Sequence, residues 1–129
     1  MWSITGAYSE RTPEDHRFMT SYNAAFERTE PTRADIDSRP GPTLIEFGTP
    51  WCGYCRAAQP LVAAALALYP QVRHLRVEDG SGKSLGRSFD VKLWPTLVVM
   101  RDGHELARVV RPADAKAIES ALGKVSPRG

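Results

Sequence analysis

Long hydrophobic runs are missing from this chain, and neither sign of charge prevails. No stretch approaches the roughly 20 apolar residues that a membrane-spanning helix needs. The 17 basic and 15 acidic side chains leave a net charge of +2, which is too small to indicate nucleic acid or a membrane surface as a partner. Residues 1–17 contain no apolar stretch of the kind found in signal peptides. We therefore expect a cytoplasmic protein with no membrane and no nucleic-acid partner.

Cysteine is scarce, and histidine is scattered. Cys52 and Cys55 are the only cysteines, and they stand in the stretch P-W-C-G-Y-C. The histidines show no ligand spacing, and a structural zinc site needs four ligands, so we expect no metal. Each histidine is expected at the surface or at its boundary: His16, His74 and His104. A disulfide across so short a loop would constrain the unfolded chain very little. These points favour a redox couple over a zinc site or a structural cross-link.

The length of 129 residues suits one domain that buries about two-thirds of its unfolded surface. Residues 12–28 carry a helix-start pattern followed by apolar residues at helical spacing, which predicts a helix. The polar, proline-containing stretch that follows is expected to be a connector with one short helical turn near residues 34–37. We therefore divide the single domain, 1–129, into an N-terminal helical segment with its connector, residues 1–41, and a core, residues 42–122.

Within the core, runs with strand character alternate with helical patterns. Strands are predicted at residues 43–47, 72–77, 96–100 and 105–110. Helices are predicted at residues 57–69, 84–89 and 113–122. The last two strands are separated by Asp102-Gly103, a dipeptide typical of a tight hairpin. This order predicts an α/β fold in which a mixed β-sheet has helices on both faces.

The two cysteines fall between a predicted strand and a predicted helix. The N-terminus of a helix stabilises a thiolate, here on Cys52. A cysteine pair with two intervening residues at such a junction is typical of redox chemistry. This placement is the main argument from the residues themselves for a working thiol–disulfide couple.

Three stretches of the chain resemble the thioredoxin superfamily. They are I-E-F-G-T-P-W-C-G-Y-C, a proline five residues after the second cysteine, and W-P-T-L-V-V-M-R-D-G, and they appear in the family's order. The resemblance covers about residues 42–122. It implies a thioredoxin fold, a central mixed β-sheet flanked by helices on both faces, here with an N-terminal helical extension. It also implies a thiol–disulfide oxidoreductase that reduces protein disulfides without a bound cofactor. Thioredoxin reductase or glutathione would supply electrons, and we expect a monomer.

The resemblance implies catalytic roles for three residues. Cys52 matches the family's exposed attacking cysteine, and Cys55 matches its buried resolving cysteine. Glu46 stands where thioredoxins carry a buried acid behind the resolving cysteine. A carboxyl group buried there can exchange a proton with Cys55 near neutral pH. The alternative for Glu46 is a partly buried acid that only satisfies a backbone donor.

Five further residues are expected to bind the substrate. Trp51, Gly53 and Tyr54 surround the attacking cysteine, and Trp51 matches the tryptophan that precedes the family's motif. Pro95 matches the cis-proline that faces the redox disulfide. The backbone before that proline pairs with an extended substrate segment in this family, which places Trp94 in the same role. Packing at the rim of the site is the alternative for Tyr54 and Trp94.

Departures from the family pattern leave other functions open. Gly53-Tyr54 replaces the usual Gly-Pro between the cysteines, and Gly48 stands where thioredoxins usually carry another tryptophan. The intervening dipeptide tunes the reduction potential, so a disulfide isomerase or oxidant is one alternative. A non-enzymatic iron–sulfur-cluster carrier of glutaredoxin type, using Cys52 with glutathione, is another. The glutathione-binding glycine pair is missing after Pro95, which argues against the carrier. A scaffold domain that retained its cysteines is a third.

Overall fold

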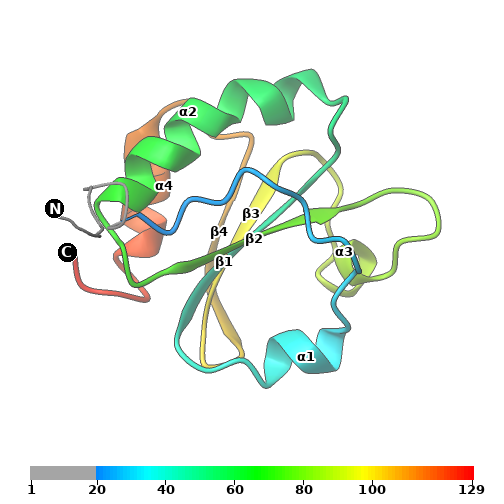
Figure 1. The fold of residues 1–129 in the computed structure, drawn as a ribbon, viewed down its shortest axis with the longest axis horizontal. Helices are drawn as coiled ribbons and strands as arrows, with labels where there is room; N and C mark the ends of the chain where they lie inside the picture. Colours follow the sequence, from blue (N-terminus) through cyan, green and yellow to red (C-terminus); the bar gives the residue numbers. More distant parts are fainter. Residues whose placement is uncertain (1–19) are drawn as a thin grey trace, which may run out of the picture.

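A computed structural model describes residues 20–129 of the chain. Within these residues, four strands form one mixed sheet in the order β2-β1-β3-β4 (Figure 1). The strands are β1 Pro42–Gly48, β2 Arg73–Glu78, β3 Thr96–Arg101 and β4 His104–Val110. β1 runs parallel to β2, whereas β3 runs antiparallel to both β1 and β4. The predicted thioredoxin fold, with its antiparallel edge hairpin, is confirmed.

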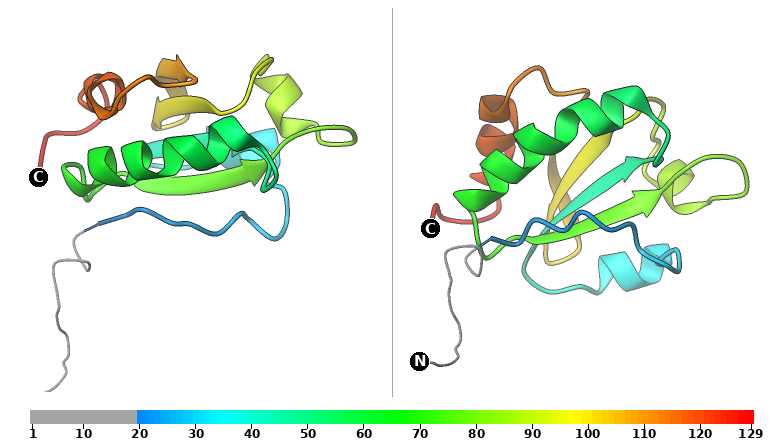
Figure 2. Two further views of the ribbon diagram at one scale, coloured as in Figure 1. Left: turned by 90° about the horizontal axis from the view of Figure 1, so that it is seen from above. Right: turned by 45° about the horizontal axis from the view of Figure 1, so that its top comes forward.

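Helices cover both faces of the sheet, as predicted. The helices are α1 Arg33–Asp37, α2 Gly53–Ala67, α3 Leu85–Ser88 and α4 Ala115–Leu122. α2 and α4 contribute to the hydrophobic core on one face, and α1 and α3 contribute to a second core on the other. Figure 2 shows the same arrangement from two further directions. No helix within residues 20–129 is long and apolar enough to cross a membrane.

The central strand β1 is buried on both faces because helices cover both faces of the sheet. Successive side chains of a strand point to opposite faces. Leu44 accordingly packs in the core beneath α2 and α4, whereas Ile45 and Phe47 pack in the core beneath α1 and α3. Glu46 shares the parity of Leu44 and therefore points toward α2. The only acidic residue of this strand is thus directed into the protein, beneath the helix that carries Cys55.

Helix α2 begins four residues earlier than the sequence pattern predicts. Cys52 is its N-cap, and its side chain accepts a hydrogen bond from the backbone N–H of Cys55 at 3.2 Å. Residues preferred at a helix N-cap carry a hydroxyl, carboxylate or amide oxygen that accepts a backbone hydrogen bond. In α2 the Cys52 sulfur takes the place of that oxygen. The first turn of the helix therefore contains Cys55. Pro60 lies inside the helix, as expected.

The predicted N-terminal helix is wrong for the part that the structure describes, residues 20–28. Instead, residues 20–27, which we call the edge segment, run beside β2 at the edge of the sheet (Figure 1). Phe26 forms a parallel bridge with Arg76, and the N–H of Glu27 donates to the Arg76 carbonyl at 2.8 Å. The backbone is satisfied by the edge of the sheet in place of helical hydrogen bonds. The rest of the predicted helix lies outside the described residues.

The short helical turn predicted in the connector is confirmed as α1. Thr32 caps it and Asp35 bonds back to the Thr32 N–H, which completes a capping box. The hairpin between β3 and β4 is also confirmed. Asp102 and Gly103 both have positive φ, the conformation that a tight two-residue turn requires.

Candidate active site

The two cysteines lie at the junction of β1 and α2 and occupy different environments. Both are free thiols. The expectation that Cys52 is exposed is wrong, because only 7% of it is exposed, whereas Cys55 is buried as expected, at 1%. The Cys52 sulfur accepts a backbone N–H from the first turn of α2. Hydrogen-bond donors at a helix N-terminus stabilise a thiolate. The Cys52 sulfur therefore lies at the N-terminus of α2, where a backbone N–H of the helix is directed at it.

Cys55 is held as a thiol. Burial, reinforced by hydrogen bonding to Cys52, raises the pKa of Cys55 to about 12. The negative charge of Glu46 acts in the same direction, and a backbone hydrogen bond from Thr49 acts against it. At neutral pH the Cys55 sulfur therefore keeps its proton. It can act as a nucleophile only if another group removes that proton.

Aromatic side chains form an exposed rim beside the cysteines. Trp51 is 69% exposed and Tyr54 is 61% exposed. Trp51 stands edge-on to Trp94, with 5.6 Å between ring centroids. A shallow depression is lined by Gly53, Tyr54 and Ala57 on the first turns of α2. Exposed aromatic surface of this kind is typical of a binding site for a partner.

The loop before β3 faces this rim. The Trp94–Pro95 peptide bond is cis, in agreement with the family resemblance. The Trp94 indole N–H donates to the Asp79 carboxylate at 2.9 Å. Arg111, from the loop after β4, donates through Nε to the Trp94 carbonyl at 2.8 Å, and its guanidinium lies 3.9 Å from the centre of the Tyr54 ring. These contacts bring Trp51, Tyr54 and Trp94 together.

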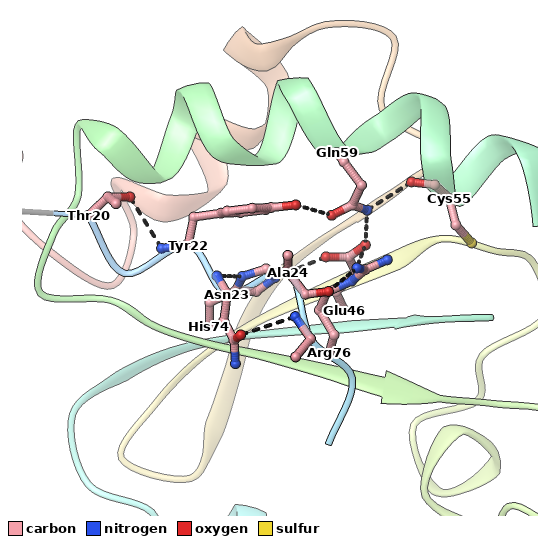
Figure 3. A network of polar contacts seen from close by, with 10 residues as sticks. Thr20, Tyr22, Asn23, Ala24, Glu46, Cys55, Gln59, His74 and Arg76 are labelled. Carbon is pink, nitrogen blue, oxygen red and sulfur yellow. Dashed lines mark hydrogen bonds and ion pairs between the residues drawn. The ribbon is translucent and has the colours of Figure 1, made fainter. Parts of the chain in front are cut away.

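Glu46 lies beneath α2 in a buried polar network, drawn in Figure 3. The residue is 1% exposed. Its Oε1 lies 2.9 Å from Nε2 of His74, and its Oε2 accepts a hydrogen bond from Nε2 of Gln59. Arg76 approaches the same Oε2 with Nε at 3.5 Å, a distance of charge attraction without hydrogen-bond geometry. Buried charges of this kind persist because they are paired and hydrogen-bonded.

Gln59 joins this network to the redox pair. The nitrogen that donates to Glu46 also donates to the backbone carbonyl of Cys55 at 2.8 Å. Figure 3 shows the Cys55 sulfur directed away from that amide. The Glu46 carboxylate and the Cys55 backbone are therefore linked through one side chain of α2.

The expectation that His74 lies at the surface or its boundary is wrong. His74 is 3% exposed and stacks on Tyr22, with 5.3 Å between ring centroids. Gln59 and Tyr22 were also missed as parts of the site. The signal that could have found His74 is the period of two along β2, which puts His74 and Arg76 on the same side, opposite Leu44 and Glu46 in the register.

Comparison with known proteins agrees with this geometry. The family model described as Thioredoxin matches residues 25–124. The chain belongs to the thioredoxin family. The solved structure of reduced thioredoxin 2 from Pseudomonas aeruginosa PAO1 is 53% identical, with a TM-score of 0.71, and the match covers 80% of this chain and 99% of that one. Thioredoxin from Chlamydia pneumoniae is 30% identical over 84 residues, which are 65% of this chain and 82% of that protein.

This thioredoxin family member is a thiol–disulfide oxidoreductase that acts on disulfide substrates. Similarity extends to protein disulfide-isomerase A3 of Gallus gallus, 35% identical over 105 residues, but the matched region is only 21% of that protein. Nothing in these comparisons favours the isomerase alternative over a thioredoxin. Within residues 20–129, no group of three or more histidine, cysteine or acidic side chains could hold a metal ion.

Proposed function

We propose that Cys52 attacks the substrate disulfide and that Cys55 resolves the product. The Cys52 thiolate forms a bond to one substrate sulfur, the substrate S–S bond breaks, and the other sulfur leaves and takes up a proton. Cys55 then loses its proton and attacks the Cys52 sulfur. The substrate leaves with its second thiol, and two electrons have passed from the cysteine pair to the substrate. The asymmetry of the two sulfurs carries this proposal: one caps a helix, and the other is a buried thiol with a pKa of about 12.

Glu46 is proposed as the group that accepts the Cys55 proton. As a carboxylate, Glu46 raises the pKa of Cys55. Once it has taken the proton it is neutral, and that opposition to the Cys55 thiolate disappears. One proton transfer therefore deprotonates Cys55 and at the same time neutralises the Glu46 charge that raises the pKa of Cys55. General acid–base help of this kind contributes about 10²–10⁴-fold to a rate.

The substrate surface is proposed to comprise Trp51, Gly53, Tyr54, Trp94 and Pro95. The exposure of Trp51 and Tyr54 supports this proposal, as does the contact between Trp51 and Trp94. In this structure Arg111 Nε donates a hydrogen bond to the Trp94 carbonyl. A substrate backbone that pairs with this carbonyl therefore has to displace Arg111 or share the acceptor with it.

The partners follow from the same chemistry. We propose that the protein works as a monomer in the cytoplasm and is returned to the dithiol by a thioredoxin reductase, with glutathione as the second candidate donor. Membership of the thioredoxin family supports a thioredoxin reductase as the donor. Size-exclusion chromatography with light scattering tests the monomer. Reduction of the oxidised protein by purified reductase, compared with glutathione, tests the donor.

Trapping the mixed disulfide tests the assignment of the two cysteines. A Cys55→Ser variant, incubated with a protein disulfide substrate, is expected to accumulate a covalent adduct through Cys52. The matched Cys52→Ser variant is expected to accumulate none. An adduct that forms equally well through Cys55 would overturn the assignment.

A further inference from the structure

Three consecutive residues of the edge segment each hold one of the side chains that contact Glu46. The Tyr22 hydroxyl donates to Oε1 of Gln59 at 2.8 Å. The backbone N–H of Asn23 donates to Nδ1 of His74 at 2.9 Å. The Ala24 carbonyl accepts from a guanidinium N–H of Arg76. All three partners then meet on the same buried carboxylate (Figure 3).

The contact with Asn23 fixes the protonation of the His74 ring. A backbone N–H can only donate, so Nδ1 must offer a lone pair. In a neutral imidazole the single proton is then on Nε2. Nε2 lies 2.9 Å from Glu46 Oε1 and therefore donates to the carboxylate. A second proton could enter His74 only at Nδ1, where it would expel the Asn23 N–H.

The contact with Tyr22 fixes the orientation of the Gln59 amide. Burial raises the pKa of Tyr22, so its hydroxyl keeps its proton and donates at neutral pH. Because the hydroxyl holds Oε1, the amide nitrogen faces Glu46 and the Cys55 carbonyl. If the Gln59 amide were reversed, its oxygen would face two other acceptors, the Glu46 carboxylate and the Cys55 carbonyl. The edge segment thus presents Glu46 with hydrogen-bond donors from both Gln59 and His74.

We propose that the edge segment is a positioning element for proton transfer, in which Asn23 and Tyr22 fix a neutral His74 ring and the Gln59 amide so that Glu46 stays a carboxylate, the form that can accept the Cys55 proton. This inference rests on the proposed role of Glu46. In its acid form Glu46 would need an acceptor for its own O–H, and neither His74 nor Gln59 offers one while the edge segment is in place. The acid form of Glu46 is therefore not stabilised by a hydrogen bond to either side chain.

Charge changes around Glu46 come from every element packed against it. Tyr22 belongs to the edge segment, Cys55 to α2, and His74 and Arg76 to β2, beside Glu46 itself on β1. Among these groups, only His74 can change from a neutral to a positively charged form by taking up a proton. The Asn23 N–H opposes that change. Without it, an imidazolium would hold Glu46 as a carboxylate and make it a poor proton acceptor.

A matched pair of variants at residue 23 separates the backbone donor from the side chain. Asn23→Pro removes the N–H that His74 accepts, and Asn23→Ala keeps it. Both lose the side-chain contact from Asn23 Oδ1 to the Ala25 N–H. The measurement is the rate at which a preformed mixed disulfide on Cys52 is resolved by Cys55, from pH 5 to pH 8. The rate of Cys52 alkylation over the same range is the control for the first step.

The Pro variant is expected to lose about tenfold in the resolving rate at the acid end of this range, whereas the Ala variant follows the parent protein. Alkylation of Cys52 should not change in either. Tyr22→Phe keeps the ring stacked on His74 but frees the Gln59 amide, and it is expected to slow resolution at every pH. Identical pH profiles for the Pro and Ala variants would overturn the proposal.

A second measurement does not depend on how the Pro variant folds. Nitrogen NMR of the parent protein at pH 7.5 is expected to find the His74 proton on Nε2, and a proton on Nδ1 would contradict the proposal. These experiments distinguish failure of the edge-segment proposal from failure of the proposed function. Failure of the Cys55→Ser adduct would remove the cysteine assignment, whereas matching residue-23 profiles with a normal adduct would remove only the role of the edge segment.

Discussion

Gly48 and Cys55 fit together with no room for one additional carbon atom. A Cβ atom placed on Gly48 would lie 2.5 Å from the Cys55 sulfur. Gly48 is also the last residue of β1, directly before the loop that leads to the cysteines. A glycine replaces the usual tryptophan at this position. The buried Cys55 sulfur occupies the space that a side chain on residue 48 would need.

Gly48→Ala is therefore expected to displace the Cys55 sulfur and to slow resolution of the mixed disulfide by about tenfold or more, since misplacement of a reacting atom by about 1 Å can cost that much or more. The measurement is the single-turnover decay of a mixed disulfide on Cys52. Cys52 alkylation is the internal control, because the atoms that a Cβ on Gly48 would meet within 4 Å beyond its chain neighbours belong to the Cys55 side chain and not to Cys52. A decay rate equal to that of the parent would contradict the steric argument.

Glu46→Gln is expected to slow the resolving step by about 10²-fold at pH 7, because the amide cannot take the Cys55 proton. The deficit should shrink at high pH, where hydroxide removes that proton directly. Glu105→Gln is the control, since Glu105 pairs with Arg108 on β4 and takes no part in the site. A uniform loss at all pH values would point to distortion of the site by the new amide.

The stability of the reduced protein is expected to fall as the pH rises from 9 to 12. The pKa of Cys55 is raised from its ordinary value of 9.0 to about 12 in the folded state. Its stabilising contribution is complete below pH 9 and is lost through this window, because the unfolded chain gives up the proton first. The expected slope approaches about 1.4 kcal/mol per pH unit. Urea unfolding of the reduced protein at pH 8 and pH 10, compared with Cys55→Ala, isolates this contribution.

Trp51→Ala is expected to raise the KM for a protein disulfide several-fold while the rate with a small disulfide such as oxidised dithiothreitol is unchanged. The reason is that this exposed indole offers apolar contact area to a large partner, which a small molecule does not use. Trp51→Phe, which keeps an aromatic ring, should recover most of the binding. An equal loss with both substrates would place Trp51 in the chemistry of the cysteines.

The reduction potential of the cysteine pair is expected near that of thioredoxins, about −270 mV. Equilibration against glutathione or dithiothreitol, followed by tryptophan fluorescence, measures it. A value of about −120 to −180 mV, the range of oxidants and isomerases, would mean that Gly53-Tyr54 has tuned the pair toward forming or shuffling disulfides.

The core of the fold was predictable because its signals are local. Strand and helix periods, the hairpin dipeptide and the cysteine junction each depend on a few neighbouring residues. The predicted strand at residues 43–47 corresponds to β1, and the predicted hairpin turn lies between β3 and β4. The start of α2 was misplaced because a cysteine sulfur caps it, which residue preferences for helix caps do not anticipate.

The edge segment and the surroundings of Glu46 were not predictable from local patterns. Apolar residues at helical spacing favoured a helix up to residue 28, but tertiary contacts with β2 decide its described part. His74 and Gln59 look like ordinary polar residues until the strand register places one opposite Leu44 and the helix places the other above Glu46. Their role depends on partners that lie 28 and 13 residues away along the chain.

The edge segment also affects the tendency of the protein to aggregate. An uncovered outer strand is a template on which a second chain can add itself, and so a starting point for aggregation. Phe26 and Glu27 occupy that side of β2 at Arg76. Proteolytic clipping just after residue 27 would therefore open the sheet to self-association and, in the same cut, remove the contacts around Glu46. A cut there is therefore expected both to promote aggregation and to slow the resolving step.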